Sequence, residues 1–239
     1  QKNIVKLNSE QQEKLTKKLS DQKTKQEELK TKIDAAKEAG ADCAKFQTFV
    51  TSKIVSDGGF SKMTLQGVHG SWGRSVSDVF KDVEFPISWH QEIANYCKQV
   101  GIDFSTSPYF KEAVDLCVDM KVPFIKIGSG EITWLEMLDY TARKGIPVML
   151  ATGDATMAEI DDAIRTIERT GNRDLVLMQC ITNYPSKIDS ANVNVLKTYQ
   201  SAFDCLTGYS DHSPGHVVAL ASVVLGGRGV GKNFSLNKK

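Results

Sequence analysis

The chain has 239 residues, 30 Lys and Arg against 29 Asp and Glu, a formal net charge of +1 and 41% hydrophobic residues. These values are typical of a globular domain, and they exclude a collagen, a disordered chain and a polyelectrolyte that coats nucleic acid. The longest apolar stretch, residues 217–225, is interrupted by Ser222 and is far shorter than the about 20 residues of a membrane-spanning helix. The length suits one large domain and falls slightly below the about 250 residues typical of an α/β barrel.

Residues 1–32 differ in composition from the rest of the chain, because they are rich in Lys, Gln and Glu and lack aromatic side chains. They predict a solvent-exposed helix with a thin stripe of leucines, preceded by a strand-like pair, Ile4 and Val5. The alternative is a basic surface for nucleic acid or membrane. Interspersed acidic residues and the missing aromatic residues argue against it. We therefore divide the chain into an N-terminal helical segment, 1–32, and a main domain, 33–239.

After a short helix at 33–39, apolar runs alternate with stretches of helical periodicity. We expect strands at 41–47, 102–107, 122–129, 147–152, 175–181, 206–210 and 230–236. Strands buried on both faces read as continuous apolar runs, and no Gly-rich dinucleotide-binding motif follows any of them. The pattern therefore predicts an α/β fold of the (β/α)8 TIM-barrel type.

The first step of this pattern is longer than the others. Residues 51–82 are rich in Gly and Ser and include His69, Trp72 and Arg74, and a helix is expected at 89–100. Long loops after barrel strands often form substrate lids, and a disordered insertion is the alternative.

Two lysines, Lys45 and Lys126, lie within apolar strands. A buried ammonium without a partner is costly, so an anion is a natural partner. Matching strand ends carry hydroxyl groups at Ser107, Ser129 and Ser210. Together they favour a pocket for a phosphate or carboxylate. The alternative is that each lysine reaches solvent or pairs with Glu131 or Asp211.

His212 follows Asp211 at the end of an expected strand. A neutral imidazole can bind a divalent metal, but a single histidine is more often structural. His216 lies four residues later, and Pro214 and Gly215 make a shared helical face unreliable. The residues alone leave metal binding open.

The five cysteines occur without any Cys-x-x-Cys spacing. Their odd number and their positions in apolar runs predict buried free thiols in a reducing cytoplasm.

Four short motifs occur in one order: 40–47 (Gly-Ala-Asp-Cys-Ala-Lys-Phe-Gln), 126–131 (Lys-Ile-Gly-Ser-Gly-Glu), 183–185 (Asn-Tyr-Pro) and 208–212 (Gly-Tyr-Ser-Asp-His). Together they resemble the N-acetylneuraminate (sialic acid) synthase family. The resemblance implies a (β/α)8 barrel followed by a small antifreeze-like domain. It also implies condensation of phosphoenolpyruvate with N-acetylmannosamine or a related sugar, releasing phosphate, with Mn²⁺ or Mg²⁺ as the divalent metal. A homodimer would agree with it.

The resemblance also assigns roles to residues of this chain. Catalysis would involve Glu131, Lys126 and Tyr184. Substrate would contact Lys45, Gln47, Thr106, Ser107, Ser129, Asn183 and Ser210. His212 and Asn233 would occupy the two metal-ligand positions.

The chain departs from the family pattern at several points. The lysine-rich segment stands where the family has its first strand, with an Ala-Glu-Ile-Gly-x-Asn-His type of motif. The last strand, usually Glu-Lys-His-Phe, reads Gly-Lys-Asn-Phe at 231–234, which replaces a carboxylate and an imidazole. The usual Ser-Thr-Gly-Met reads Ala-Thr-Gly-Asp at 151–154, and the sequence stops at Lys239, before any antifreeze-like domain. We therefore expect a barrel with about seven of eight strands.

Three functions stay open at this point. The first is an active synthase of the family. The second is a member that binds phosphoenolpyruvate or sugar without turnover, and the third is another phosphoenolpyruvate-dependent barrel enzyme acting on a different aldehyde.

Overall fold

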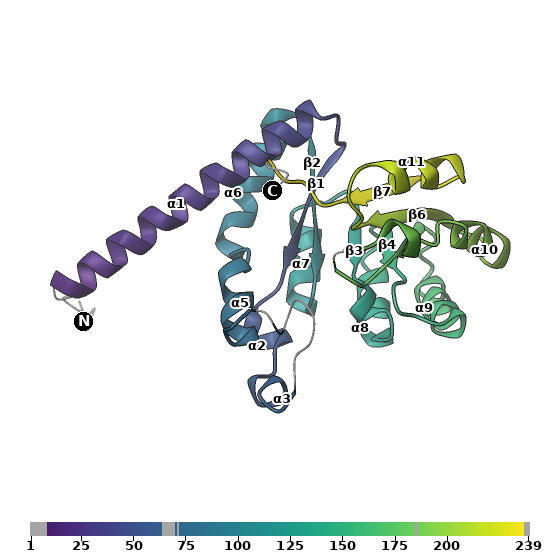
Figure 1. Ribbon diagram of the computed structural model, residues 1–239, viewed down its shortest axis with the longest axis horizontal. Helices are drawn as coiled ribbons and strands as arrows, with labels where there is room; N and C mark the ends of the chain where they lie inside the picture. The colour runs from purple at the N-terminus through teal and green to yellow at the C-terminus, as the bar shows by residue number, and fades with distance from the viewer. Residues whose placement is uncertain (1–8, 64–69, 71, 185, 237–239) are drawn as a thin grey trace.

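A computed structural model describes residues 9–63, 70, 72–184 and 186–236. Its centre is one parallel sheet of seven strands in the order β1-β2-β3-β4-β5-β6-β7 (Figure 1). The strands are β1 Cys43–Thr48, β2 Asp103–Pro108, β3 Ile125–Ile127, β4 Val148–Ala151, β5 Leu175–Cys180, β6 Leu206–Asp211 and β7 Gly229–Lys232. Among the described residues β7 does not pair with β1, so the sheet is a curled, open barrel. The expected α/β barrel with seven strands is confirmed.

One helix precedes β1, and the others lie between the strands, where several of them cover the outer face of the sheet (Figure 1). The described helices are α1 Ser9–Glu38, α2 Thr51–Ile54, α3 Asp57–Phe60, α5 Val76–Val83, α6 His90–Val100, α7 Lys111–Asp119, α8 Leu135–Ala142, α9 Met157–Arg169, α10 Val195–Ala202 and α11 Val217–Val224, with 3-10 turns η1 Ile87–Trp89, η2 Ser129–Glu131 and η3 Ile188–Ser190. Helix α9 shows why they form: a capping box between Thr156 and Glu159 starts it, and Ile160, Ile164 and Ile167 bury its apolar face. None of the helices in the described part of the chain is long and apolar enough to span a bilayer.

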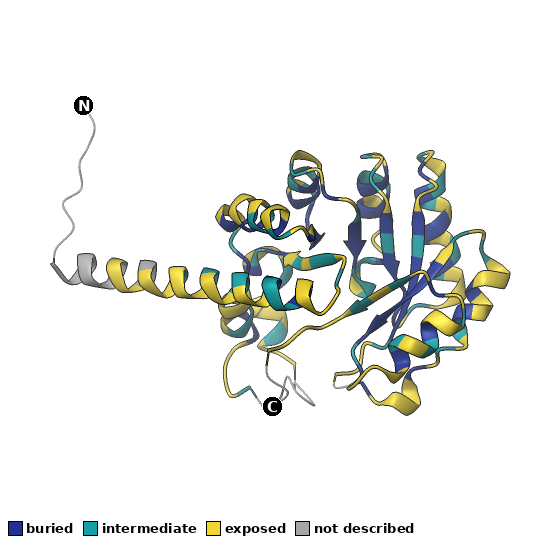
Figure 2. Cartoon of the chain, turned by 90° about the horizontal axis from the view of Figure 1, so that it is seen from above, coloured by how far each residue is buried: buried dark blue, intermediate teal, exposed yellow. Residues whose placement is uncertain are grey.

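Helix α1 runs without a break from Ser9 to Glu38, through the expected boundary at residue 32. It ends before Gly40, which adopts a φ of +85° that favours glycine. Ile33, only 2% exposed, packs into the core with its C-terminal part, while the N-terminal part projects from the body of the protein (Figures 1 and 2). The expected strand-like Ile4 and Val5 lie outside the described residues.

The strand register separates the sheet into an inner and an outer face. Paired residues in parallel strands point to the same side, so the pairs Lys45–Ser105, Gln47–Ser107, Lys126–Met149, Met178–Gly208, Cys180–Ser210 and Ser210–Gly231 share the inner face. The outer face carries Ile125, Ile127, Leu150 and Leu177, all fully buried in the core against the helices. The inner face of the curl thus carries Lys45, Lys126 and several hydroxyl groups beside Met149 and Met178, whereas the outer face is mainly apolar.

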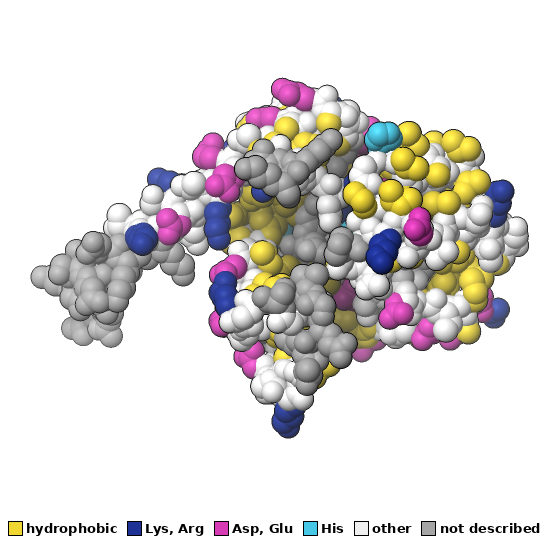
Figure 3. Space-filling view, in the orientation of Figure 1, with side chains coloured by type: hydrophobic (Ala, Val, Ile, Leu, Met, Phe, Trp, Pro, Cys, Tyr) yellow, Lys and Arg dark blue, Asp and Glu magenta, His cyan; other side chains and the backbone are white. Residues whose placement is uncertain are grey.

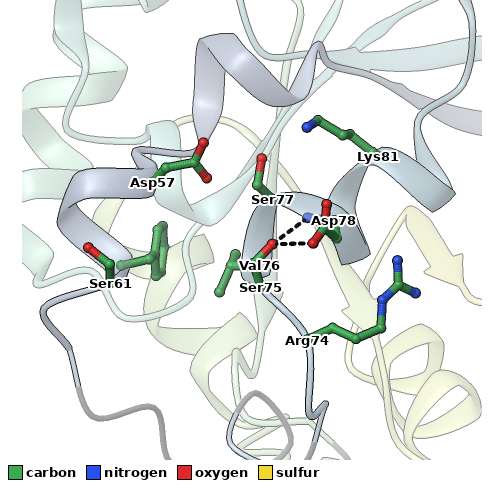
Figure 4. Close-up of a pocket in the computed structure, with 9 residues that line it drawn as sticks. Asp57, Ser61, Arg74, Ser75, Val76, Ser77, Asp78 and Lys81 are labelled. Atoms are coloured by element: carbon green, nitrogen blue, oxygen red, sulfur yellow. Dashed lines mark hydrogen bonds between the residues drawn. The ribbon is translucent and has the colours of Figure 1, made fainter.

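The segment after β1 is partly helical, because α2 and α3 lie within the expected loop 51–82 and α5 begins within it and ends at Val83. A cavity of about 320 Å³ lies between α3 and α5, and Ser75 caps α5 by accepting a hydrogen bond from the Asp78 amide (Figure 4). His69 lies outside the described residues. None of the side chains to which the resemblance assigned a role lines this cavity.

Hydrophobic side chains gather on the surface over α11, beside the free edge of β7 (Figure 3). The exposed residues of this helix are Val217, Leu220, Val223 and Val224. Their exposure agrees with a barrel that is open at this edge.

Candidate functional site

The side chain of Lys126 extends across the interior of the curled sheet. Lys126 on β3 donates a hydrogen bond to Ser210 Oγ on β6 over 2.6 Å. The two residues are only 9% and 3% exposed, and burial lowers the pKa of Lys126. Within the described residues no carboxylate lies within ion-pair distance of Lys126.

Lys45 lies on the same inner face, at the open edge formed by β1. Its side chain keeps contact with solvent, yet the protein packed around its ammonium lowers its pKa to about 8, and the charge of Lys126 contributes. Its ammonium donates a long hydrogen bond of 3.5 Å to the Phe46 carbonyl. Within the described residues neither lysine forms an ion pair with Glu131 or Asp211, and the part of the alternative in which a lysine reaches solvent holds for the exposed Lys45. Two ammonium groups that repel each other, neither paired with a described carboxylate, favour binding of an anion.

Ser129 sits at the end of β3, at the rim of the same interior. Its Oγ accepts a hydrogen bond from the Gly153 amide over 3.0 Å and lies 3.0 Å from Cys180 Sγ. A Cβ at Gly153 would come within 2.9 Å of Ser129 Oγ and closer to Cys180 Sγ, so glycine permits this approach. Ser107, 4% exposed, lies on the inner face. The structure thus brings the three predicted serines and the two lysines to one side of the sheet.

Thr106 points the other way. Its Oγ1 lies 2.8 Å from Thr48 Oγ1, which in turn lies 2.6 Å from His90 Nε2, and His90 Nδ1 is 3.1 Å from the Pro86 carbonyl. Successive side chains of a strand face opposite sides, so Thr106 and Ser107 cannot both face the interior. The structure therefore does not bring Thr106 together with the other residues assigned to substrate.

A second group of polar side chains lies at the mouth of the curl. Gln47 Nε2 donates to the Tyr109 hydroxyl over 2.9 Å. The Glu131 carboxylate folds over Gly128, where a Cβ would meet Glu131 Oε2, and burial raises the pKa of Glu131. Burial and the Glu131 charge both raise the pKa of Tyr109. A groove of about 560 Å³ is lined by Tyr109, Glu131 and Trp134, among others.

Sequence reasoning missed Tyr109. Its signal is its place directly after the Ser-Pro pair that ends β2, where a barrel strand delivers side chains to its mouth.

Tyr184, His212 and Asn233 form a row on the same side of the mouth. The Tyr184 hydroxyl lies 3.0 Å from His212 Nε2, and the two rings lie 4.7 Å apart. Asn233 Nδ2 lies 3.4 Å from His212 Nδ1. Burial and the charge of Lys126 lower the pKa of His212, so its imidazole is neutral at pH 7.

Asn183 has an exposed side chain. Its carbonyl accepts a hydrogen bond of 2.7 Å from Ser186 Oγ, which shapes the turn that carries Tyr184.

Comparison with known proteins finds similar sequences over most of the chain. A family model described as the NeuB family matches residues 32–239. The chain is 31% identical over 210 residues to the pseudaminic acid synthase of Helicobacter pylori, covering 87% of this chain and 61% of that protein. It is 32% identical over 213 residues to the N-acetylneuraminate-9-phosphate synthase of Mus musculus, covering 87% and 58% respectively. The chain thus spans about three fifths of the length of these relatives.

A solved structure has the same fold. It is the N-acetylneuraminic acid synthetase of Leptospira borgpetersenii, which superimposes with a TM-score of 0.77 at 23% identity, covering 87% of this chain and 67% of that one.

Proposed function

The chain belongs to the NeuB family, and from this premise we propose that it binds phosphoenolpyruvate and condenses it with N-acetylmannosamine or a related N-acetylated sugar. The observation that carries the proposal is the buried Lys126–Ser210 contact beside Lys45. Relatives named as pseudaminic, N-acetylneuraminate-9-phosphate and N,N'-diacetyllegionaminic acid synthases support this substrate class.

Phosphoenolpyruvate carries a phosphate and a carboxylate on a small enol, so it needs two cationic contacts close together. Lys45 and Lys126 provide them, and both have a lowered pKa because each ammonium is partly removed from water. A bound anion stabilises both charges. The hydroxyl groups of Ser107, Ser129 and Ser210 supply neutral hydrogen bonds that fix its orientation.

The sugar aldehyde would then approach from the mouth. In the reaction the enol carbon forms a bond to the aldehyde carbon, the aldehyde oxygen takes up a proton, one water is consumed and phosphate leaves. Gln47, Tyr109 and Glu131 lie where the sugar would enter, and the raised pKa of Glu131 makes it a better proton donor near neutral pH.

One observation favours a second candidate function, binding of phosphoenolpyruvate without turnover. Gly231 stands where the family pattern has a carboxylate, and a Cβ there would have only Ser210 Oγ within 4 Å, at 3.9 Å. The inner face therefore has open space at the position of an acidic group.

All five cysteines are free thiols. They fit a reducing compartment, and we place the proposed reaction in the cytoplasm.

Isothermal titration calorimetry with phosphoenolpyruvate, followed by measurement of phosphate release and product mass with N-acetylmannosamine, tests the proposal. We expect binding that Lys126→Met abolishes and that Lys197→Met, a change at an exposed lysine of α10, leaves unchanged. Binding without phosphate release would favour the second candidate. Absence of binding by the folded wild-type chain would exclude both.

A further inference from the structure

The resemblance implies a divalent metal at His212 and Asn233, and the donor set of this chain does not fit one. These residues offer one imidazole and one amide. Mn²⁺ and Mg²⁺ prefer carboxylate oxygens, and histidine-rich sites use several imidazoles. In the part of the chain that the structure describes, no group of three or more His, Cys, Asp or Glu side chains is placed to hold a metal ion.

The neighbouring carboxylate, Asp211, is already fully engaged on the other side of the strand. It is completely buried, and its oxygens accept hydrogen bonds from Lys232 Nζ over 2.6 Å and from the amide and hydroxyl of Ser213 over 2.8 and 2.7 Å. Turning Asp211 toward His212 would break these hydrogen bonds of a fully buried carboxylate and its ion pair with the partly exposed Lys232, which is destabilising.

The charge around His212 also disfavours a dication. Three ammonium groups disfavour positive charge at the imidazole, those of Lys126, Lys45 and Lys232. One carboxylate, that of Asp211, favours it. A divalent ion there would meet three positive charges with no described carboxylate as a ligand.

The hydrogen bonds of His212 instead form a directed chain. The Asn233 amide nitrogen faces Nδ1, and an NH₂ group donates, so Nδ1 carries the lone pair and the proton lies on Nε2. Nε2–H then donates to the Tyr184 oxygen over 3.0 Å. In this arrangement the proton of the Tyr184 hydroxyl is free to donate elsewhere.

We propose that His212 is a positioning residue in this chain and not a metal ligand: held in its Nε2–H tautomer by Asn233, it presents the Tyr184 hydroxyl as the hydrogen-bond donor to the sugar aldehyde. Tyr184 is 54% exposed at the mouth, so its hydroxyl is accessible to an incoming sugar. The role toward the aldehyde rests on the proposed function, whereas the tautomer and the metal preference do not.

The tautomer is tested by ¹⁵N–¹H correlation spectra of the histidine side chains at pH 7.5 without added metal, with His212 assigned by its loss in His212→Gln. We expect the Nε2–H form in the wild type. Asn233→Asp introduces an acceptor and should shift His212 to the Nδ1–H form. Tyr184→Phe keeps the ring and should move the Nε2 resonance alone. A wild-type Nδ1–H form would overturn the proposal.

The metal preference is tested by titration with Mn²⁺ followed by electron paramagnetic resonance. We expect no bound-ion signal that depends on His212 in the wild type. Asn233→His should bind Mn²⁺ at least about tenfold more tightly, since even second-shell partners change affinity that much, and His212→Ala should remove the gain. A wild-type Mn²⁺ site that His212→Ala abolishes would refute the inference. Both tests use the protein without substrate, so they can fail independently of the proposed condensation.

Discussion

Lys126 and Ser210 join two strands that are not neighbours, since the Lys126 ammonium on β3 lies 2.6 Å from the Ser210 hydroxyl on β6. Between them lie β4 and β5, whose inner faces carry Met149 and Met178. This hydrogen bond therefore spans the inner face of the curled sheet, from β3 to β6.

Removing either partner of this bond should have different effects on stability. Ser210→Ala leaves a buried ammonium without its acceptor, and we expect the free energy of unfolding to fall by about 1.5–3 kcal/mol. Lys126→Met removes the charge and its need for a partner, so it should be less destabilising or neutral, while abolishing phosphoenolpyruvate binding. Urea denaturation at pH 7 without anions compares the two. Equal losses in both variants would contradict this account, and Ser190→Ala, at an exposed serine of η3, is the control.

Anion binding should weaken as the pH rises through the pKa of Lys45, about 8. Phosphate is doubly ionised above about pH 7, so the ligand itself changes little there. One pH unit above its pKa only about one tenth of the lysine is protonated, so affinity should fall by up to about tenfold between pH 7 and 9. Calorimetry with phosphoenolpyruvate at pH 7, 8 and 9 measures this. Lys45→Arg stays charged and should flatten the profile, and a wild-type profile that is already flat would count against a role for Lys45.

The lowered pKa of Lys45 also affects the stability of the fold. Anion affinity should fall as the pH rises, whereas the free energy of unfolding should increase. The folded state lowers the pKa of Lys45 from 10.5 to about 8, so it disfavours the protonated form that the unfolded chain carries. The resulting destabilisation is full below pH 8 and is relieved as the pH rises from about 8 toward 10.5. Relative to the wild type, Lys45→Met should therefore be more stabilising at pH 7 than at pH 10 in urea denaturation. If the difference in unfolding free energy between Lys45→Met and the wild type is the same at pH 7 and pH 10, Lys45 has the same pKa in the folded and unfolded states.

Much of this site follows from patterns in the sequence. Apolar runs bounded by turns located each strand to within a few residues, and the placement of Lys45 and Lys126 within such runs predicted two cations in the barrel. Successive side chains of a strand face opposite sides, so Ser107 and Thr106 must lie on different faces of β2. If the orientation of any one residue of β2 is known, the sequence therefore predicts that Ser107 faces the interior and Thr106 does not.

Other relationships depend on how separate segments meet. The pairing of Tyr184 with His212 joins loops after β5 and β6, and that of Gln47 with Tyr109 joins β1 to the end of β2. No local periodicity encodes such contacts. Composition alone divides the chain at residue 32, whereas helix α1 runs unbroken past this point and buries Ile33 in the core.

The opposite faces of β2 predict different effects for neighbouring substitutions. Thr106→Val removes the hydroxyl that contacts Thr48, and we expect about 1 kcal/mol lower stability with unchanged phosphoenolpyruvate affinity. Ser107→Ala should reduce affinity with little change in stability, because its hydroxyl faces the proposed anion. Calorimetry and urea denaturation of both variants test this. If a stably folded Thr106→Val variant binds phosphoenolpyruvate more weakly than the wild type, Thr106 contributes to substrate binding after all.

Two glycines of the inner face should respond differently to the same substitution. A Cβ at Gly208 would overlap the Gly229 carbonyl oxygen and lie 2.6 Å from Met178 Sδ, so the backbone must move. We expect Gly208→Ala to lower the free energy of unfolding by about 1–3 kcal/mol. At Gly231 the nearest atom, Ser210 Oγ, lies 3.9 Å away, and alanine also restricts the unfolded chain. Gly231→Ala should therefore be neutral or slightly stabilising. Urea denaturation of both variants compares them, and equal destabilisation would mean that β7 packs against β6 more closely at Gly231 than the structure shows.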